Sequence, residues 1–176
     1  MKHSILFSAV GMVAALSAAP AYAASELVQN TNTATAICQG SSGNQEKLVK
    51  RPLGIINNGD VPTLVSCSFT TSKTDPQNRI VEYFGAFFSN ETARMATVTC
   101  TGVQGLEGES NNVYETQSVG VLPHGRPGTP TTGYIFFGRS STSDPLLYQN
   151  VAMSCQLPPG VSINDTYVGF YLDDAT

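Results

Sequence analysis

Apolar and polar residues alternate along most of this chain, whereas a helical period is hard to find. The alternating segments are separated by clusters of Gly, Pro, Asn, Asp and Ser, residues that favour turns. The pattern predicts eight β-strands, at residues 33–38, 64–70, 79–88, 93–103, 113–122, 133–138, 147–157 and 165–172. We therefore expect an all-β fold, an antiparallel two-layer β-sandwich that is immunoglobulin-like or a jelly roll.

The first 23 residues have the three parts of a secretory signal peptide. Lys2 supplies the positive charge, residues 5–16 are apolar, and the A-Y-A motif at residues 21–23 is a cleavage site of the expected kind. The apolar run is shorter than the roughly 20 residues that a membrane-spanning helix needs. We expect cleavage after Ala23, no membrane span, and a secreted or periplasmic product in which residues 24–176 form one domain.

The four cysteines fit both the strands and the export signal. Cys67, Cys100 and Cys155 share the parity of their apolar neighbours, so their thiols are expected to point into the core. An even set of cysteines in an exported chain indicates two disulfides, whereas zinc is disfavoured because no C-x-x-C pair is present. Of the three possible pairings we favour Cys38 with Cys67 and Cys100 with Cys155, because segments close in sequence are usually close in space.

Composition narrows the range of partners. Charged residues make up 12% of the chain, against about 25% in an average globular protein, and the net charge is −4. The largest basic cluster is Lys47, Lys50 and Arg51, so nucleic acid is a poor partner. Trp is absent, which disfavours a large polysaccharide groove because such grooves depend on broad aromatic side chains.

No motif in the sequence predicts a reaction, a cofactor or a metal. The chain has neither a G-x-S-x-G elbow nor an H-E-x-x-H motif nor a phosphate loop. His124 lies in a proline-rich loop, where we expect an exposed residue that is not a catalytic base. The loop at residues 107–112 carries Glu107, Glu109 and two Asn, which are too few oxygen ligands for tight calcium binding.

Two alternatives keep a specific chemistry open. A secreted hydrolase would use strand-borne carboxylates, either Glu82 with Glu115 or Asp165 with Asp173. The ordinary interpretation of these carboxylates is a solvated sheet face.

The other alternative is a protease inhibitor. In that case the stiff loop from Pro123 to Pro130 would present Arg126 to a protease pocket, since a pre-organised loop loses less entropy on binding. Proline-rich loops between strands are also common without such a function.

The stretch from Cys155 to Val168 (CQLPPGVSINDTYV) resembles the end of small exported proteins of Gram-negative bacteria. That resemblance implies export and a β-domain, and it implies no activity. Chaperone-assembled pilins are similar in being exported, disulfide-bonded and immunoglobulin-like, but they end in an alternating strand with a penultimate aromatic. This chain ends in L-D-D-A-T instead, so it departs from the donor-strand pattern.

The leading hypothesis is a non-catalytic exported module that acts through its surface as a binding or structural component, with a protein or glycan partner. An exposed row of Tyr and Phe on one sheet face favours this hypothesis. Two buried carboxylates that converge in a cleft favour the hydrolase instead.

Overall fold

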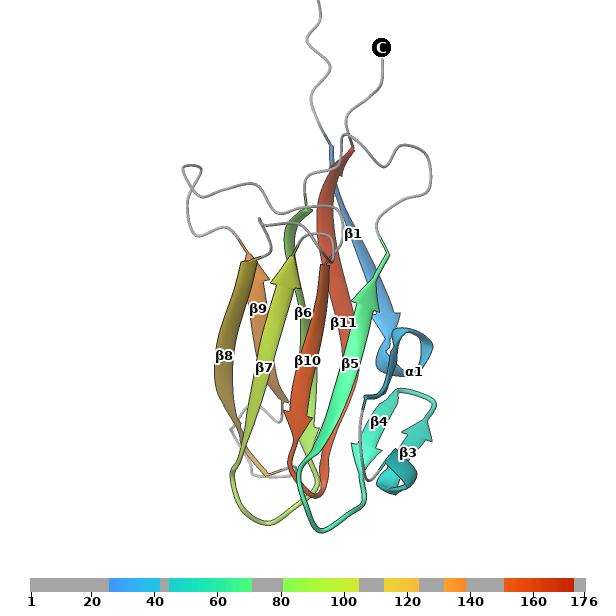
Figure 1. Ribbon diagram of the computed structural model, residues 1–176, viewed down its shortest axis with the longest axis vertical. Helices are drawn as coiled ribbons and strands as arrows, with labels where there is room; N and C mark the ends of the chain where they lie inside the picture. The colour runs from blue at the N-terminus through green and yellow to red at the C-terminus, as the bar shows by residue number, and fades with distance from the viewer. Residues whose placement is uncertain are drawn as a thin grey trace, which may run out of the picture.

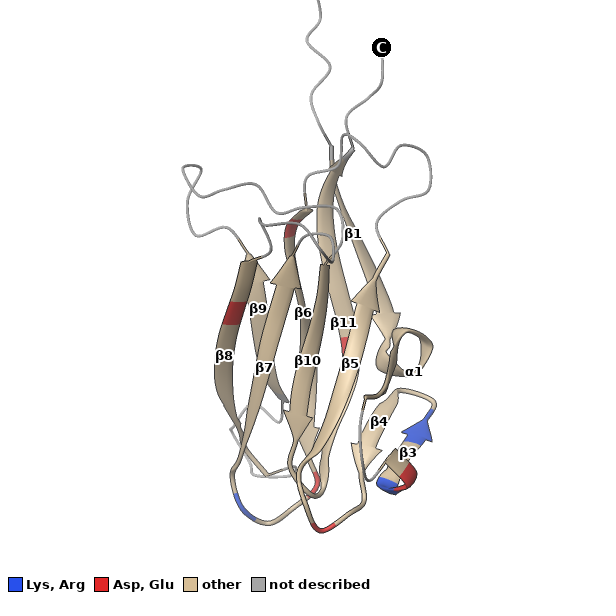
Figure 2. Cartoon of the chain, in the orientation of Figure 1, with Lys and Arg blue, Asp and Glu red and all other residues tan. Residues whose placement is uncertain are grey.

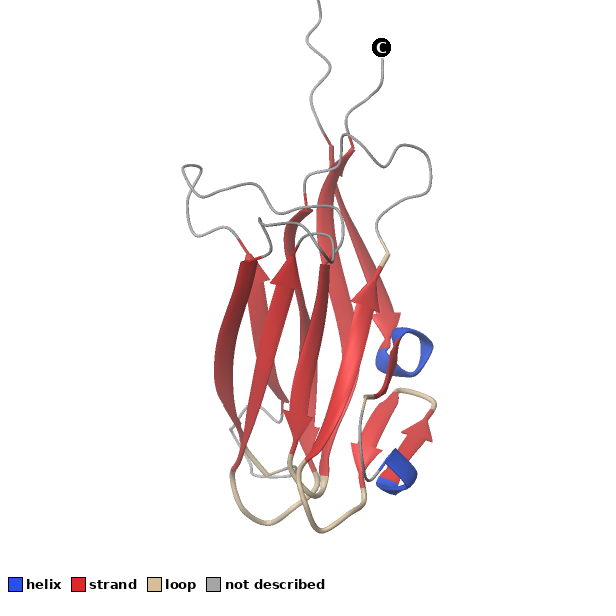
Figure 3. Ribbon diagram, viewed as in Figure 1, coloured by secondary structure: helices blue, strands red, loops and turns tan. Residues whose placement is uncertain are grey.

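The computed structural model of the chain describes residues 26–41, 45–70, 81–104, 113–123, 132–138 and 151–172. It is a β-sandwich of two antiparallel sheets, which we call sheet A and sheet B (Figures 1 and 3). Sheet B lies in front in the view of Figure 1. Sheet A has the order β3 (Leu48–Arg51), β4 (Gly54–Asn57), β11 (Val161–Leu172), β6 (Val81–Asn90) and β9 (Thr132–Gly138), and β1 (Glu26–Thr33) also pairs with β11. Sheet B has the order β2 (Cys38–Gly40), β5 (Thr63–Phe69), β10 (Val151–Leu157), β7 (Ala96–Gln104) and β8 (Val113–Val121).

Seven of the eight predicted strands are present, and the segment at residues 33–38 is the exception. Its residues Ala34–Ile37 form the short helix α1, not a strand, and Ala34 is completely buried. The chain leaves sheet A after β1 and reaches sheet B at Cys38, and a strand that simply continued could not cross between the layers. The prediction of a strand at this place was therefore wrong.

Four strands, β1, β2, β3 and β4, were not predicted. β1 is mainly polar, β2 has only three residues, and β3 is a short, largely exposed strand at an edge of sheet A. β4 is short, and Ile55 and Ile56 are both buried, so it lacks the alternation that marks a half-exposed strand. A second short helix, η1 (Gln45–Lys47), precedes β3.

Large side chains from both sheets fill the space between them. Phe84 of sheet A stacks on Phe137 of the neighbouring strand, with ring centroids 5.1 Å apart. Phe69 of sheet B contacts Phe84 across the sandwich at 5.3 Å. These rings belong to one continuous core, which the alternation of apolar residues along each strand places on the inner faces.

Both disulfides have the predicted pairing, and each joins residues that lie directly opposite in neighbouring strands of sheet B. Cys38 faces Cys67 across β2 and β5, and Cys100 faces Cys155 across β7 and β10. All four are buried, as parity predicted for Cys67, Cys100 and Cys155. Met153 faces Cys67 and lies two residues before Cys155, so sulfur atoms form a row along the inner face of sheet B.

Two buried asparagines fix the corners where the chain crosses from sheet A to sheet B. Asn57 ends β4, and its side-chain amide donates hydrogen bonds to the carbonyls of Val61 and Leu157, both at 2.8 Å. Its side-chain oxygen accepts a hydrogen bond from the Gly59 N–H at 2.9 Å. Every polar atom of this buried amide side chain therefore has a partner.

Asn90 makes the same set of contacts at the end of β6. Its amide donates to the carbonyls of Arg94 at 2.7 Å and Val121 at 2.9 Å, and its oxygen accepts from the Thr92 N–H at 2.9 Å. The β10–β11 turn lies between the two corners, because the Gly160 N–H donates to the Asn57 carbonyl at 2.7 Å. Gly160 has φ +72°, a conformation that glycine adopts without strain.

Replacing Asn57 by Ala should lower the free energy of unfolding by about 2 to 4 kcal/mol, because the buried carbonyl of Leu157 and the part-buried carbonyl of Val61 would lose their donor. The exposed neighbour Asn58 offers a matched control. Asn58→Ala should change the free energy of unfolding by no more than about 0.5 kcal/mol. Urea unfolding of both variants measures the difference. A similar loss in the two variants would contradict this role for the buried corner.

Candidate functional site

The outer face of sheet A carries a cluster of aromatic side chains from three adjacent strands. We call this cluster the aromatic surface, and its residues are Tyr83 and Phe87 of β6, Tyr134 and Phe136 of β9, and Tyr167 of β11. Ring centroids of neighbouring members lie 5.3 to 6.2 Å apart, so the rings form one connected group. Tyr134 is 62% exposed, Phe136 41% and Phe87 38%, which makes this an apolar surface open to solvent.

Glycines opposite the tyrosines let the rings lie against the sheet. Tyr167 pairs with Gly85 in the neighbouring strand, and Tyr83 pairs with Gly169. A Cβ atom on Gly85 would collide with the Tyr167 hydroxyl and the Ile135 carbonyl, and one on Gly169 would collide with the Tyr83 ring. The glycines are therefore required for the close approach of ring and backbone.

Hydrogen bonds hold the two tyrosines in place. The Tyr167 hydroxyl donates to the Ile135 carbonyl at 2.9 Å, and the Tyr83 hydroxyl donates to the side chain of Gln29 on β1 at 2.7 Å. Burial, with smaller contributions from Tyr134 and Tyr83, raises the pKa of Tyr167 to about 12. Tyr167 is thus a fixed support, and Tyr134 and Phe136 are the accessible rings above the sheet.

A β-bulge in β11 marks the end of the aromatic surface. Ile163 pairs with Phe88 and Thr166 with Ala86, so Asn164 and Asp165 together face the single residue Phe87. At this point β11 also changes its partner on the other side, from β4 to β1. Bulges of this kind redirect side chains, and this one brings two polar side chains beside the aromatic rings.

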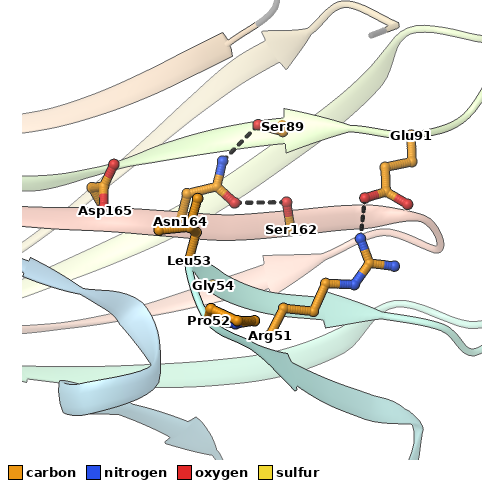
Figure 4. A pocket seen from close by; sticks show the side chains of 9 residues that line it. All are labelled: Arg51, Pro52, Leu53, Gly54, Ser89, Glu91, Ser162, Asn164 and Asp165. Carbon is orange, nitrogen blue, oxygen red and sulfur yellow. Dashed lines mark hydrogen bonds and ion pairs between the residues drawn. The ribbon is translucent and has the colours of Figure 1, made fainter.

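These two side chains help to line a pocket of about 640 Å³, which we call the polar pocket. Its lining residues are Arg51, Pro52, Leu53, Gly54, Ser89, Glu91, Ser162, Asn164 and Asp165 (Figure 4). Strand β11 runs along the middle of this group, with Ser89 and Glu91 on one side and the β3–β4 turn on the other. The volume is within the range of small-molecule binding sites.

The polar groups of the pocket are already connected to one another. The Asn164 amide donates to the Ser89 hydroxyl at 2.5 Å, and the Ser162 hydroxyl donates to the Asn164 oxygen at 2.8 Å. Arg51, the last residue of β3, forms an ion pair with Glu91, so its guanidinium reaches across β11 (Figure 4). The network holds these donors and acceptors in fixed positions at the surface.

The outer face of sheet B is chemically different. Its hydroxyl side chains pair across the strands at 2.6 to 2.9 Å, as Thr99 with Ser118, Thr101 with Thr116 and Ser66 with Ser154. Short hydroxyl side chains that satisfy one another are an ordinary solvent-facing β-surface. The aromatic surface of sheet A is thus a feature of one face of the sandwich.

The structure separates one of the carboxylate pairs that the hydrolase hypothesis names. Glu82 lies on β6 in sheet A, whereas Glu115 lies on β8 in sheet B and accepts a hydrogen bond from Gln117 at 2.6 Å. Asp165 lies in the polar pocket together with Glu91. Its predicted partner Asp173 lies outside the described residues.

Several other predicted features also lie outside the described residues. They are the signal peptide, His124, the loop at 107–112, and the inhibitor loop with Arg126, of which only Pro123 is described. Within the described ranges, no group of three or more potential metal ligands occurs. No helix there is long and apolar enough to cross a membrane.

The aromatic surface was missed, although the sequence contains a signal for it. In each of the three strands an aromatic residue lies two positions before a glycine, as Tyr83-x-Gly85, Phe136-x-Gly138 and Tyr167-x-Gly169. Residues two positions apart in a strand point to the same face, so this pattern places an aromatic ring beside a glycine on one face of the sheet. Without the strand order, nothing showed that the three strands are neighbours.

The sequence matches no known protein family and no curated protein. Among solved structures the chain is similar to a Cry1Da tryptic core variant from Bacillus thuringiensis, with a TM-score of 0.45, 10% identity, and 78% of this chain and 22% of that chain covered. It is also similar to an exo-β-1,3-galactanase from Phanerochaete chrysosporium with galactose, with a TM-score of 0.43, 12% identity, and coverage of 80% and 29%. A third match is TmCBM61 in complex with β-1,4-galactotriose, with a TM-score of 0.32, 9% identity, and coverage of 81% and 86%.

This chain thus spans less than a third of the length of the first two matched structures. With TM-scores this low, the ligand of the chain has to be inferred from its own residues.

Replacing Gly85 by Ala should lower the free energy of unfolding by about 1 to 3 kcal/mol, because the new methyl group collides with the Ile135 carbonyl and with Tyr167. Gly120→Ala is the matched control, since that exposed strand position meets only the flexible end of the Met95 side chain. Denaturant unfolding distinguishes the two variants. Equal stability of Gly85→Ala and the parent protein would show that the ring does not need this space.

The raised pKa of Tyr167 predicts a loss of stability at alkaline pH. Below pH 10 the phenol is neutral in both states, and between pH 10 and about 12 the unfolded chain releases its proton while the folded chain keeps it. The stabilisation is therefore complete below pH 10, and about 2 kcal/mol is lost as the pH rises to 12. Unfolding measured over this range should show a smaller loss in Tyr167→Phe, and the ultraviolet titration of that variant should lack the late tyrosine.

Proposed function

We propose that this chain is an exported, non-catalytic module that binds glycans on its aromatic surface. The observation that carries the proposal is the connected, solvent-exposed group of rings on β6, β9 and β11. A sugar ring has apolar C–H faces and a rim of hydroxyl groups. It therefore stacks on an aromatic face while its hydroxyls remain available to polar neighbours.

Exposure of these apolar rings to water is unfavourable in free energy unless a ligand covers them. Apolar patches that remain open to water on a folded surface usually mark binding sites. The outer face of sheet B serves as an internal comparison, because the same sandwich there carries paired Ser and Thr hydroxyls. Strand propensity alone thus does not explain why the rings gather on one face.

The rings are also held ready for binding. Tyr167 is fixed over Gly85 by its hydrogen bond to the Ile135 carbonyl, and Phe87 packs against it with centroids 5.3 Å apart. A surface whose side chains are already ordered loses little entropy when a ligand arrives. Tyr and Phe together thus provide the platform that we did not expect in a chain without Trp.

Charge favours a neutral ligand at this surface. Among the residues of β6, β9 and β11, only Glu82 and Asp165 are charged, and Figure 2 shows the strands of both sheets largely free of charge. A neutral glycan meets no electrostatic penalty there. The two buried disulfides suit an oxidising compartment outside the cytoplasm, where an exported module would meet such polymers.

Binding should depend on Tyr134, the most exposed ring of the aromatic surface. Tyr134→Ala should weaken binding to a soluble neutral polysaccharide about tenfold or more, because one stacking contact of roughly 1 to 2 kcal/mol is removed. Tyr114 on β8 is equally exposed, at 65% against 62%, but belongs to sheet B, so Tyr114→Ala is the matched control.

Affinity electrophoresis in gels that contain laminarin, galactan, mannan or xylan measures the retardation of each variant. Loss of retardation in both variants, or in neither, would contradict the assignment to this face. A dimer in sedimentation that dissociates in Tyr134→Ala, without retardation in any gel, would show that the rings bind a second copy of the chain.

A further inference from the structure

We infer that the polar pocket is the second part of the same site, and that it binds an uncharged sugar unit adjacent to the units that stack on the aromatic surface. This inference rests on the proposed function, because it assigns the ligand class and the direction in which the glycan lies. Two observations carry it. The pocket begins where the rings end, and it has one more carboxylate than cationic side chains, which disfavours an anion.

The two parts of the site are continuous along β6. Phe87 and Ser89 point to the same outer face two residues apart, and Phe87 belongs to the aromatic surface while Ser89 lines the polar pocket. On β11 the bulge places Asn164 and Asp165 opposite Phe87. A chain that stacks on Phe87 thus has its next unit beside these polar side chains.

The available length suits an oligosaccharide. From Tyr83 to Ser89 the outer face of β6 extends over six residue steps, which is roughly 20 Å at the rise of a β-strand. This length accommodates several linked sugar units, with the stacked units over the rings and one in the pocket. We therefore expect affinity to increase with chain length until both parts are occupied.

The pocket supplies the groups that sugar hydroxyls need. Asp165 and Glu91 accept hydrogen bonds, whereas the amide of Asn164 donates them. Neighbouring hydroxyls of a sugar ring both donate and accept, so they match a mixed set of this kind. Leu53, 71% exposed on the β3–β4 turn, adds an apolar contact for the C–H face of the sugar.

Charge in the pocket argues against an acidic sugar. Two carboxylates, Asp165 and Glu91, line the pocket with one guanidinium, that of Arg51. Glu91 already pairs with Arg51, so an anionic ligand would have to displace this carboxylate and approach Asp165. A neutral hexose or pentose unit meets neither cost.

The test compares two pocket variants with a surface control. The probes for affinity electrophoresis are the neutral polymers laminarin, galactan, mannan and xylan and the anionic polymers polygalacturonate and alginate. Calorimetry then measures the affinity for oligosaccharides of the polymer that binds best. Asp165→Asn and Glu91→Gln keep the side-chain shape and remove the charge of the acceptor. Glu46→Gln changes an exposed carboxylate on η1, outside the pocket, and thermal melting verifies that each variant is folded.

We expect a neutral polymer to bind best. Asp165→Asn should weaken the affinity for this polymer about tenfold, and Glu46→Gln should leave the affinity unchanged. If Tyr134→Ala abolishes binding while both pocket variants bind like the parent, the pocket is not part of the site, and the proposed function stands. If Glu91→Gln creates strong binding to polygalacturonate, the pocket is a site for anions at Arg51. If no polysaccharide binds the parent protein, both proposals fail.

Discussion

The β10–β11 turn holds the sandwich together at the end where the chain changes sheets. The Gly160 N–H donates to the carbonyl of Asn57 at 2.7 Å, and the Gly160 carbonyl accepts from the Glu91 N–H at 2.9 Å, one residue after Asn90. Both buried asparagine corners are therefore joined to a single peptide turn. Because β11 begins immediately after this turn, its register against β4 and β6 is fixed there. The bulge that separates the rings from the pocket depends on that register.

The two layers of the sandwich have separate tasks. Sheet B carries both disulfides as cross-strand links on its inner face, and its outer face is closed by hydroxyl pairs. Sheet A has no disulfide among the described residues and presents the rings to solvent on its outer side. A covalently linked layer gives the other layer a firm support, because Phe69 of β5 packs directly on Phe84 of β6. The aromatic surface of sheet A therefore lies on the opposite side of a core whose other layer is covalently linked.

Alternation along the chain was sufficient to predict the sandwich, because a half-buried strand has a period of two that the sequence displays directly. The cysteine pairing, favoured on sequence proximity, was confirmed, and parity predicted that Cys67, Cys100 and Cys155 point into the core. The strands β3 and β4 were missed because one is short and largely exposed and the other is buried on both faces. The site depended on strand order: Tyr83, Tyr134 and Tyr167 are far apart in sequence, and only pairing in sheet A makes them neighbours. Likewise, Arg51 and Glu91 meet because β4 and β6 flank β11.

The pairing of each ring with a glycine also has a consequence for how this surface can change over time. Gly169 and Tyr83 occupy one volume between them, so a larger residue at the first position is compatible only with a smaller one at the second. Gly85 is more constrained, because a Cβ atom there would collide with the Ile135 carbonyl as well as with Tyr167, and a smaller residue at position 167 would not relieve the backbone clash. Single substitutions in this inner part therefore cost stability, whereas Tyr134 and Phe136 are more exposed and less constrained. Over evolution this face thus has an inner part in which Gly85 is fixed and Tyr83 and Gly169 change only together, and an outer part that is free to diversify.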